Sequence, residues 1–316
     1  MNSRRAYNPA SLLFPVLYLL LSLAGFPAPA FCQNFTVTLL GTGNPRPTVV
    51  RFGPSILVQA DGQNLLFDCG RGATMRLYQL KVDQIDGLFL THLHSDHTVG
   101  IPDLWLTGWV MGRKTPLRVW GPAGTEEMMK HLAEAYAFDI HMRRDVDEKR
   151  PAGGVEMQAK DIEQGVVYDS GSVKVIAFLV DHGPLKPAFG YRVDYGGHSV
   201  VLSGDTRYSE NLIRYAQGTD VLVHEVIDAK AYAVLANSFT PEEKARVLAH
   251  HTTAEEAGKV FTKVAPKLAV YSHIVPPDAP NLVPDTRNTY SGPLEVGEDL
   301  MSIEIGKEVR VHRANQ

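Results

Sequence analysis

Short runs of hydrophobic residues, separated by turn residues, recur along most of the chain, and stretches with helical spacing of apolar positions lie between them. Runs rich in β-branched and aromatic residues predict strands, and apolar positions at helical spacing predict helices. We expect strands at 37–40, 55–59, 64–67, 85–90, 117–120, 173–180, 189–193, 199–202, 221–224 and 268–271. We expect helices at 74–80, 97–111, 125–138, 241–250 and 253–264, with Thr125 as an N-cap. This alternation predicts an α/β protein, with the charged, Gly- and Pro-containing stretch 141–165 as a surface excursion.

Residues 1–32 follow a different pattern. Arg4 and Arg5 precede an almost unbroken apolar run over 12–26, and small residues follow it at 28–30. This order is typical of a secretory signal peptide. The alternative is a membrane anchor, for which the run is short but sufficient. Phe31 before Cys32 argues against a lipoprotein signal. We therefore expect a signal peptide over 1–32 and a single domain over 33–316, exported to the periplasm or secreted, with no stable membrane span after signal removal.

Charge and cysteine content narrow the possible partners and the sources of stability. Removing the two arginines of residues 1–32 changes the formal net charge from −4 to −6. An acidic protein is a poor candidate for broad binding to phosphate backbones, which relies on lysine and arginine. The chain has only Cys32 and Cys69, so we expect stability to come from core packing and from metal rather than from disulfides.

The segment 91–97 carries the strongest chemical signal. Three histidines and an aspartate, His92, His94, Asp96 and His97, follow directly on an apolar strand. Imidazole and carboxylate are ligands that suit zinc and similar cations, and alternation in an extended chain places His92 and His94 on one side. The chain must then turn for Asp96 and His97 to face a second ion. Two neighbouring divalent ions can lower the pKa of a shared water and so generate a nucleophile.

This segment resembles the HxHxDH signature of hydrolases with the metallo-β-lactamase fold, and the other motifs of that family follow in the same order. They are Asp68 after a strand, His182 after a long strand, Asp205 in Ser203–Thr206, and His273 after the strand 268–271. The resemblance implies a four-layer αββα sandwich of two mixed sheets with outer helices. It implies one ion on His92, His94 and His182, and a second on Asp96, His97 and His273. Asp205 would bridge the two ions, and Asp68 would orient ligands by contacting them without binding an ion itself. Zinc is the expected metal, although this ligand set also accepts manganese or iron.

Further motifs resemble the ribonuclease Z and arylsulfatase-like branch of the family. They are the opening Leu39–Pro45, Phe67–Gly70, Phe189–Val193, Gly204–Thr206, His224–Glu225 and His251–Ala257. Many two-zinc β-lactamases have cysteine where this chain has Asp205, which argues against a lactamase. The resemblance implies that Glu225 and His251 form a pair that handles a proton, and the alternative is a strand-end acid beside a helix-terminal histidine. Asp96, Glu225 and His251 are thus the candidate catalytic residues.

One departure from ribonuclease Z concerns the arm that grips tRNA, which many members insert between the strands that correspond to 189–193 and 199–202. Here residues 194–198 leave room only for a tight turn. Together with the acidic charge and the expected signal peptide, this argues against a nucleic-acid partner.

The leading hypothesis is therefore a dinuclear metal-dependent hydrolase of small phosphodiesters or aryl sulfate esters, with a small-molecule ester as its partner. The alternatives are a ribonuclease Z-type tRNA 3′-end endonuclease, a lactonase or β-lactamase acting on carbonyl substrates, and a non-catalytic metal-binding protein. Trp105, Trp109 and Tyr136 are candidates for an aryl pocket, with core packing the favoured role for each. A homodimer stays open, because members of this branch are often dimers.

Overall fold

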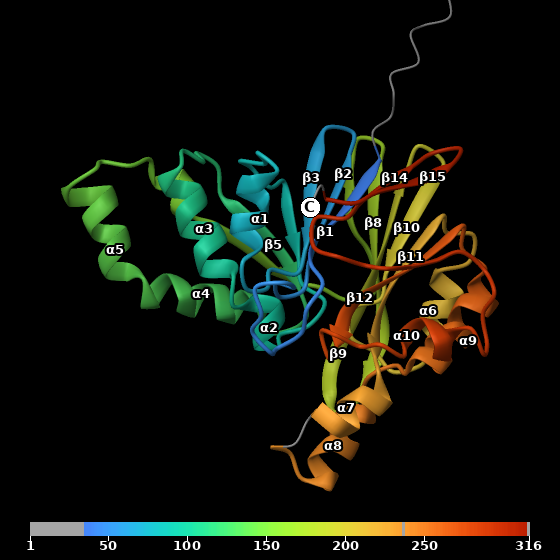
Figure 1. Ribbon diagram of the computed structural model, residues 1–316. Helices are drawn as coiled ribbons and strands as arrows, with labels where there is room; N and C mark the ends of the chain where they lie inside the picture. Colours follow the sequence, from blue (N-terminus) through green and yellow to red (C-terminus); the bar gives the residue numbers. More distant parts are fainter. Residues whose placement is uncertain (1–34, 236–237, 315–316) are drawn as a thin grey trace, which may run out of the picture. The chain divides into compact units, whose positions relative to one another are not determined.

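The structure is a computed structural model that describes residues 35–235 and 238–314. The expected signal peptide over 1–32 lies outside the described residues, so it stays a prediction. Two mixed β-sheets and flanking helices make up the described part of the chain (Figure 1). No helix within 35–235 or 238–314 is both long enough and apolar enough to cross a membrane.

The first sheet has eight strands in the order β15-β14-β1-β2-β3-β4-β5-β6. The pairs from β15 to β3 are antiparallel, and those from β3 to β6 are parallel. The strands are β1 (Thr36–Gly41), β2 (Ser55–Ala60), β3 (Gln63–Phe67), β4 (Gly87–Phe89), β5 (Leu117–Gly121), β6 (Met157–Asp161), β14 (Ser302–Ile305) and β15 (Val309–His312).

The second sheet has seven strands in the order β13-β12-β11-β10-β9-β8-β7. The pairs from β13 to β10 are parallel, and those from β10 to β7 are antiparallel. The strands are β7 (Gly165–Ser170), β8 (Val173–His182), β9 (Leu185–Tyr195), β10 (His198–Leu202), β11 (Val221–Ile227), β12 (Leu268–Val275) and β13 (Leu294–Val296).

Helices lie on the outer side of each sheet, and others lie beyond the strand ends at the bottom of the view (Figure 1). On the first sheet these are α1 (Ala73–Gln79), α2 (Ser95–Thr98), α3 (Ile101–Val110), α4 (Thr125–Ala135) and α5 (Ala137–His141), followed by the short helices η1 (Met142–Val146) and η2 (Ala152–Val155). Near the second sheet are α6 (Glu210–Tyr215), α7 (Ala229–Leu235), α8 (Pro241–Leu248), α9 (Ala254–Val264) and α10 (Leu282–Thr286).

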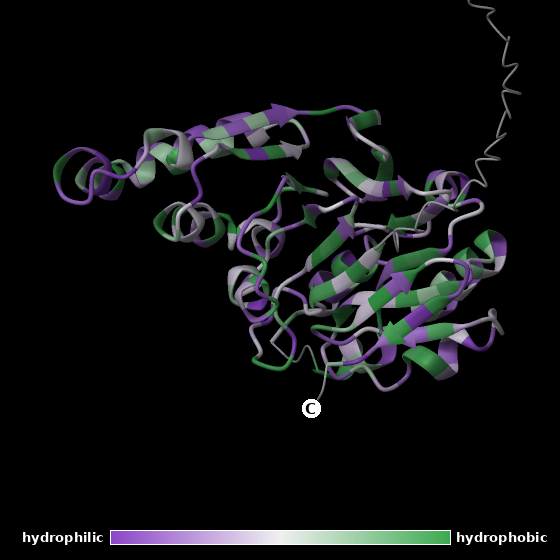
Figure 2. Ribbon diagram, turned by 90° about the horizontal axis from the view of Figure 1, so that it is seen from above, coloured by the Kyte–Doolittle hydropathy of each residue, from purple (hydrophilic) through white to green (hydrophobic). Residues whose placement is uncertain are grey.

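Three hydrophobic clusters hold these layers together. Strand residues of both sheets, such as Val37 and Val200, form the cluster between the sheets. Leu66 packs with residues of α1, α3 and α4 outside the first sheet, and Phe261 packs with α6 and β12 outside the second. Alternate strand residues therefore face a helix layer or the other sheet, and Figure 2 shows hydrophobic positions along the central strands. The predicted αββα sandwich is confirmed.

Several local predictions differ from the structure. The expected helix 97–111 is divided into α2 and α3, because the chain turns at Gly100 to bring α2 beside residues 69–70. Gly124, rather than Thr125, is the N-cap of α4, and the Thr125 hydroxyl donates to the carbonyl of Pro122. The stretch 141–165 is more than a surface excursion, because it contains β6, which pairs with β5.

Candidate metal centre and active site

The candidate ligands lie where strands of both sheets end. His92 and His94 follow β4, and Asp96 and His97 lie on α2. From the second sheet, His182 is the last residue of β8, Asp205 follows β10, and His273 lies near the end of β12. The carboxyl ends of parallel strands meet at one edge of a sheet, and the two sheets face each other, so ligands that are distant in sequence converge.

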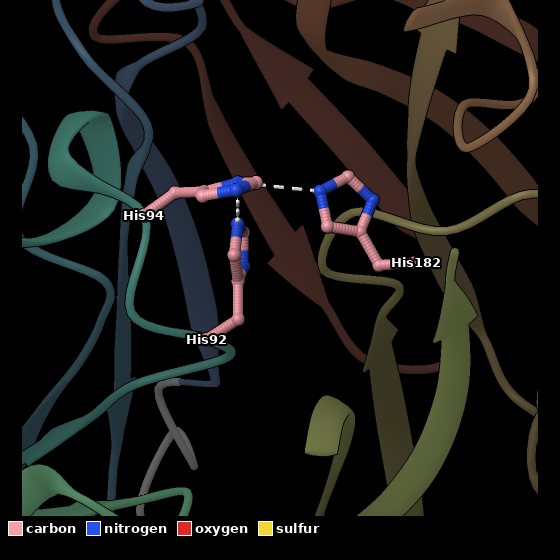
Figure 3. Close-up of side chains that lie close together, drawn as sticks. All are labelled: His92, His94 and His182. Atoms are coloured by element: carbon pink, nitrogen blue, oxygen red, sulfur yellow. Dashed lines mark hydrogen bonds between the residues drawn. The ribbon is translucent and has the colours of Figure 1, made fainter. Parts of the chain in front are cut away.

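Three histidines form the first group. The Nε2 atom of His92 lies 3.0 Å from Nδ1 of His94, which in turn lies 3.3 Å from Nε2 of His182. Figure 3 shows the three rings directed toward one another from the loop after β4 and from the end of β8. His92 and His182 are buried, whereas His94 is exposed, so one side of this group is open to solvent.

Asp96, His97 and His273 form the second group. Nε2 of His273 lies 3.3 Å from Oδ2 of Asp96, and Nε2 of His97 lies 3.6 Å from the same oxygen. Oδ2 of Asp205 lies between the two groups. It is 3.2 Å from Nε2 of His273, 3.4 Å from His97, 3.9 Å from His92 and 4.0 Å from His182. One carboxylate therefore reaches both groups.

These distances fit the spacing of ligands around a cation. A tetrahedral ion with ligands at about 2.1 Å separates those ligands by about 3.4 Å from one another. Nε2 of His97 and Oδ1 of Asp205 are buried, and neither has a hydrogen-bond partner among the described residues. A buried polar atom without a partner is costly. A divalent cation at each group would satisfy these atoms, so the residues fit a metal centre.

Asp68 fixes the orientation of two candidate ligands. Its Oδ2 accepts hydrogen bonds from Nδ1 of His97 at 2.7 Å and from the hydroxyl of Thr91 at 2.8 Å. The Thr91 hydroxyl lies 2.9 Å from Nδ1 of His92 and, since its proton goes to Asp68, it accepts there. His182 likewise donates from Nδ1 to the carbonyl of His250 at 3.0 Å. In all three histidines the proton sits on Nδ1, which leaves the Nε2 lone pair for a metal.

The backbone around these residues takes conformations that most residues avoid. Asp68 has φ of 57° and His273 has φ of 44°. Such values cost free energy and cluster at functional sites. At Gly70 a Cβ atom would lie 2.6 Å from the carbonyl oxygen of Asp96, so only glycine lets the loop after β3 approach α2 this closely.

Glu225 and His251 form a buried pair beside the second group. Oε1 of Glu225 accepts from Nδ1 of His251 at 3.2 Å, and also from the backbone N–H groups of Thr206 and Thr252 at 3.1 and 3.0 Å. These contacts hold the residues next to Asp205 and His251 in place. Because Nδ1 of His251 is bonded to Glu225, Nε2 is the nitrogen available to the adjoining cavity, which His251 lines.

The comparisons with known proteins agree with this geometry. The family model described as "Beta-lactamase superfamily domain" matches residues 63–274, which is more than half of the chain. A ribonuclease Z from Mycolicibacterium gilvum (strain PYR-GCK) is 35% identical over 280 residues, which cover 85% of this chain and 96% of that protein.

The chain belongs to the metallo-β-lactamase superfamily. It is a metal-dependent hydrolase that acts on ester bonds. The predicted likeness to ribonuclease Z is confirmed by its relatives.

Solved structures show the same fold. The metallo-β-lactamase fold protein YhfI from Bacillus subtilis matches with a TM-score of 0.66 at 19% identity, covering 85% of this chain and 98% of that one. The short form of human tRNase Z matches with a TM-score of 0.63 at 23% identity, covering 86% of this chain and 99% of that one. At these identities the likeness concerns the fold alone.

The charges in this superfamily member suit metal binding. Burial, together with the neighbouring His97, lowers the pKa of His92 well below its usual value, and burial lowers that of His182 to about 4. Burial alone would raise the pKa of Asp205, but His273 and His97 hold it well below its usual value. Neutral imidazoles and an ionised carboxylate are the forms that bind a metal.

The pKa values of two other histidines are raised rather than lowered. For His97, the carboxylates of Asp205 and Asp68 outweigh the effect of burial and raise the pKa well above its usual value. For His251, Glu225 outweighs burial and raises the pKa to about 9. Each ring thus lies in an environment that attracts a positive charge.

The structure brings together every residue that the sequence suggested for the site. They are Asp68, His92, His94, Asp96, His97, His182, Asp205, Glu225, His251 and His273. Thr91 and Thr252 were missed, because a threonine that relays hydrogen bonds carries no motif of its own. Arg46 and Phe239, which line the cavity beside the centre, were missed because they lie in loops without periodicity.

The three aromatic residues considered for an aryl pocket lie elsewhere. Trp105 and Trp109 are buried beneath the first sheet, and their N–H groups donate to the carbonyls of Val155 and Pro151. Tyr136 packs edge-on against Trp105. None of the three lines the cavity beside the metal centre, so core packing, the favoured alternative, describes the two tryptophans.

Proposed function

We propose that this chain hydrolyses a phosphodiester bond of RNA, as a metal-dependent phosphodiesterase of the ribonuclease Z type. The observation that carries the proposal is the 35% identity with a ribonuclease Z over 96% of that protein's length. The buried Glu225–His251 pair beside the candidate ligands supports it, because breaking a phosphodiester bond requires a proton for the departing oxygen. This choice differs from the leading hypothesis drawn from the sequence, since the relatives favour its ribonuclease Z alternative.

One divalent cation would be held by His92, His94 and His182, and a second by Asp96, His97 and His273. Asp205 would contact both cations. When bound, such cations lower the pKa of water and neutralise negative charge that develops on phosphate oxygens. Zinc suits this set of imidazoles and carboxylates.

The protein's own residues manage the leaving group. Glu225 accepts a hydrogen bond from the Nδ1–H of His251, which leaves Nε2 as the nitrogen available to the cavity that His251 lines. Water adds to phosphorus and loses a proton to solvent, the bond from phosphorus to the ester oxygen breaks, and His251 donates its Nε2 proton to that oxygen. The products are an alcohol and a phosphate monoester. His251 then takes a proton back from solvent.

A second candidate function is hydrolysis of a small phosphodiester or an aryl sulfate ester. One observation favours it: β9 and β10 are joined by Gly196 and Gly197 alone, both at positive φ, so this hairpin carries no inserted arm that could hold a tRNA body. The formal net charge of −4 also favours a small substrate over a long polyanion. We also propose export to the periplasm or the medium, because the sequence of residues 1–32 is typical of a signal peptide.

The test is hydrolysis by the purified full chain, loaded with zinc. End-labelled single-stranded RNA, a tRNA precursor, bis(p-nitrophenyl) phosphate and p-nitrophenyl sulfate would be offered in parallel. Cleavage of RNA, with loss of at least a hundredfold in kcat in His251→Ala, is the expected result.

Turnover of the small esters without RNA cleavage would replace the proposal by the second candidate. If neither RNA nor the esters react, lactones and β-lactams become the substrates to test. Binding of metal without any turnover would favour a metal-binding protein.

A further inference from the structure

A cavity of about 680 Å³ adjoins the candidate metal centre. This volume is in the range that binds small molecules or a single nucleotide unit. His94, Asp96 and His251 line its polar side. Asp205 and His273 of the candidate metal centre also line it, and so do residues at and after the end of β12. The rest of the lining comes from α7, from α8 with the residues around it, and from the loop after β1, which contribute no candidate metal ligand.

The side formed by α7 and α8 is apolar. Tyr232 and Leu235 on α7, Phe239 just before α8, and Val247 on α8 line the cavity there. Phe239 is 48% exposed and Leu235 is 44% exposed. A large aromatic side chain that stays half exposed at a cavity wall offers a flat apolar surface to a ligand.

Two residues of this apolar wall, Tyr232 and Val247, pack against the strands that carry the site. Tyr232 packs with Ile227 of β11 and Val275 of β12 in a separate small hydrophobic cluster, and Val247 packs against it. Asp228, at the start of α7, accepts hydrogen bonds from the N–H groups of Ala231 at 3.0 Å and Asn281 at 2.9 Å. Tyr232 and Val247 therefore keep a defined position relative to Glu225 on β11 and His273 on β12.

A cation lies on another side of the same cavity. The exposed Arg46 lines it, and no carboxylate among the described residues forms an ion pair with its guanidinium. The Arg46 backbone N–H donates to Oδ1 of Asn44 at 2.9 Å, while Nδ2 of Asn44 donates to the carbonyl of Ile274 at 2.6 Å. Arg46 is thus tethered to the residue that follows His273, and its guanidinium is free to pair with a phosphate oxygen.

We propose that this cavity is a nucleotide subsite, in which a nucleobase packs on Phe239 while Arg46 pairs with its phosphate. The proposal rests on the proposed function, since it places a nucleotide next to the reacting phosphorus. It names the substrate class as esters that carry a nucleobase or a similar planar aromatic group. An alkyl or sugar phosphate would leave the apolar wall uncovered.

Binding of two matched phosphates separates the role of the base from that of the phosphate. The zinc-loaded full chain is titrated in a calorimeter with uridine monophosphate and with ribose 5-phosphate. Both ligands have a ribose and a phosphate, but only uridine monophosphate carries a base. Stacking of one base on an aromatic side chain is worth about 1–3 kcal/mol, so we expect the nucleotide to bind roughly 5- to 150-fold more tightly.

Two variants and a control assign the effect to named residues. Phe239→Ala is expected to bring the affinity for uridine monophosphate down to that for ribose 5-phosphate and to leave the latter unchanged. Arg46→Ala is expected to weaken both ligands about tenfold. Phe138→Ala, which removes an 80% exposed phenylalanine on α5, is the matched control and is expected to change neither. All three side chains are exposed, so the thermal midpoint should stay close to that of the wild type.

Equal binding of the two ligands by the wild type, or unchanged base preference in Phe239→Ala, would overturn the subsite. That outcome leaves the proposed function intact if RNA or bis(p-nitrophenyl) phosphate is still hydrolysed. Conversely, a base preference that depends on Phe239, together with no hydrolysis of any phosphodiester, would support the subsite and contradict the proposed function.

Discussion

Replacing Asp68 with asparagine should weaken metal binding strongly while leaving the fold intact. Oδ1 of Asp68 accepts from the N–H of Thr91 at 2.8 Å, and Oδ2 accepts from both His97 and the Thr91 hydroxyl. An asparagine that keeps its oxygen toward the Thr91 N–H must place an amide NH₂ where Oδ2 was. Turning the amide over would instead place the NH₂ group against the Thr91 N–H.

The amide NH₂ would reverse two chains of hydrogen bonds. Nδ1 of His97 would have to accept, which moves its proton to Nε2. The Thr91 hydroxyl would accept from the amide and donate to Nδ1 of His92, which moves the proton of His92 to Nε2 as well. Both candidate ligands would then lose the lone pair that faces the centre.

Loss of a hydrogen-bond partner that orients a metal-binding histidine typically weakens metal affinity 10- to 100-fold. Because two ligands are affected, we expect a loss of about 100-fold, or about 2.7 kcal/mol. Asparagine tolerates the positive φ of residue 68, so the backbone should not change.

Competition with a chromophoric zinc chelator measures this affinity. Asp86→Asn is a suitable control, because Oδ2 of Asp86 accepts one backbone N–H, from Asn64, away from the centre. Zinc affinity in Asp68→Asn within twofold of the wild type would refute the proposed orientation of His92 and His97.

The remaining predictions concern stability. Trp105→Ala should lower the free energy of unfolding by about 3–5 kcal/mol in urea titrations, because it removes a fully buried indole and its bond to Val155, and kcat should change little in the folded fraction. Removal of metal by a chelator should lower the thermal midpoint, since metal present at about 1,000 times its Kd stabilises the fold by about 4 kcal/mol; an unchanged midpoint would argue against a bound metal. Burial alone would raise the pKa of Asp220, but hydrogen bonds from Lys267 and from the Ser199 N–H lower it. Its carboxylate therefore stabilises the fold above its unfolded pKa, and this contribution is lost as the pH falls through the lowered folded pKa. Asp220→Asn should be less stable by about 1–2 kcal/mol at pH 7, and the two unfolding free energies should converge below about pH 4.

The sequence was most informative where chemistry and periodicity coincide. His92, His94, Asp96 and His97 follow a buried strand within a few residues, so their convergence could be predicted from local sequence. His182, Asp205 and His273 could be placed only through the resemblance to a family, because the pairing of distant strands is not encoded in any single segment.

Elements that depend on tertiary contacts were not predicted. Strand β6 lies in a charged stretch and is stabilised by its pairing with β5 at the edge of the sheet. The division of the helix at Gly100 follows from the bond between its N–H and the carbonyl of Cys69, which joins residues on different elements. The cavity wall was missed for the same reason, since Phe239 and Arg46 come to line one cavity only in the folded chain.

We propose that these residues form a divalent-metal centre that hydrolyses phosphodiesters. The most direct test measures metal content and hydrolysis of RNA and bis(p-nitrophenyl) phosphate on the same samples of wild type and Asp205→Ala. Oδ2 of Asp205 lies within 4.0 Å of four candidate ligands, so the variant should lose both bound metal and activity. We expect the wild type to bind divalent metal and to cleave a phosphodiester. A wild type that cleaves equally well with and without metal, or an Asp205→Ala variant with full metal content and full activity, would contradict a metal-dependent centre at these residues.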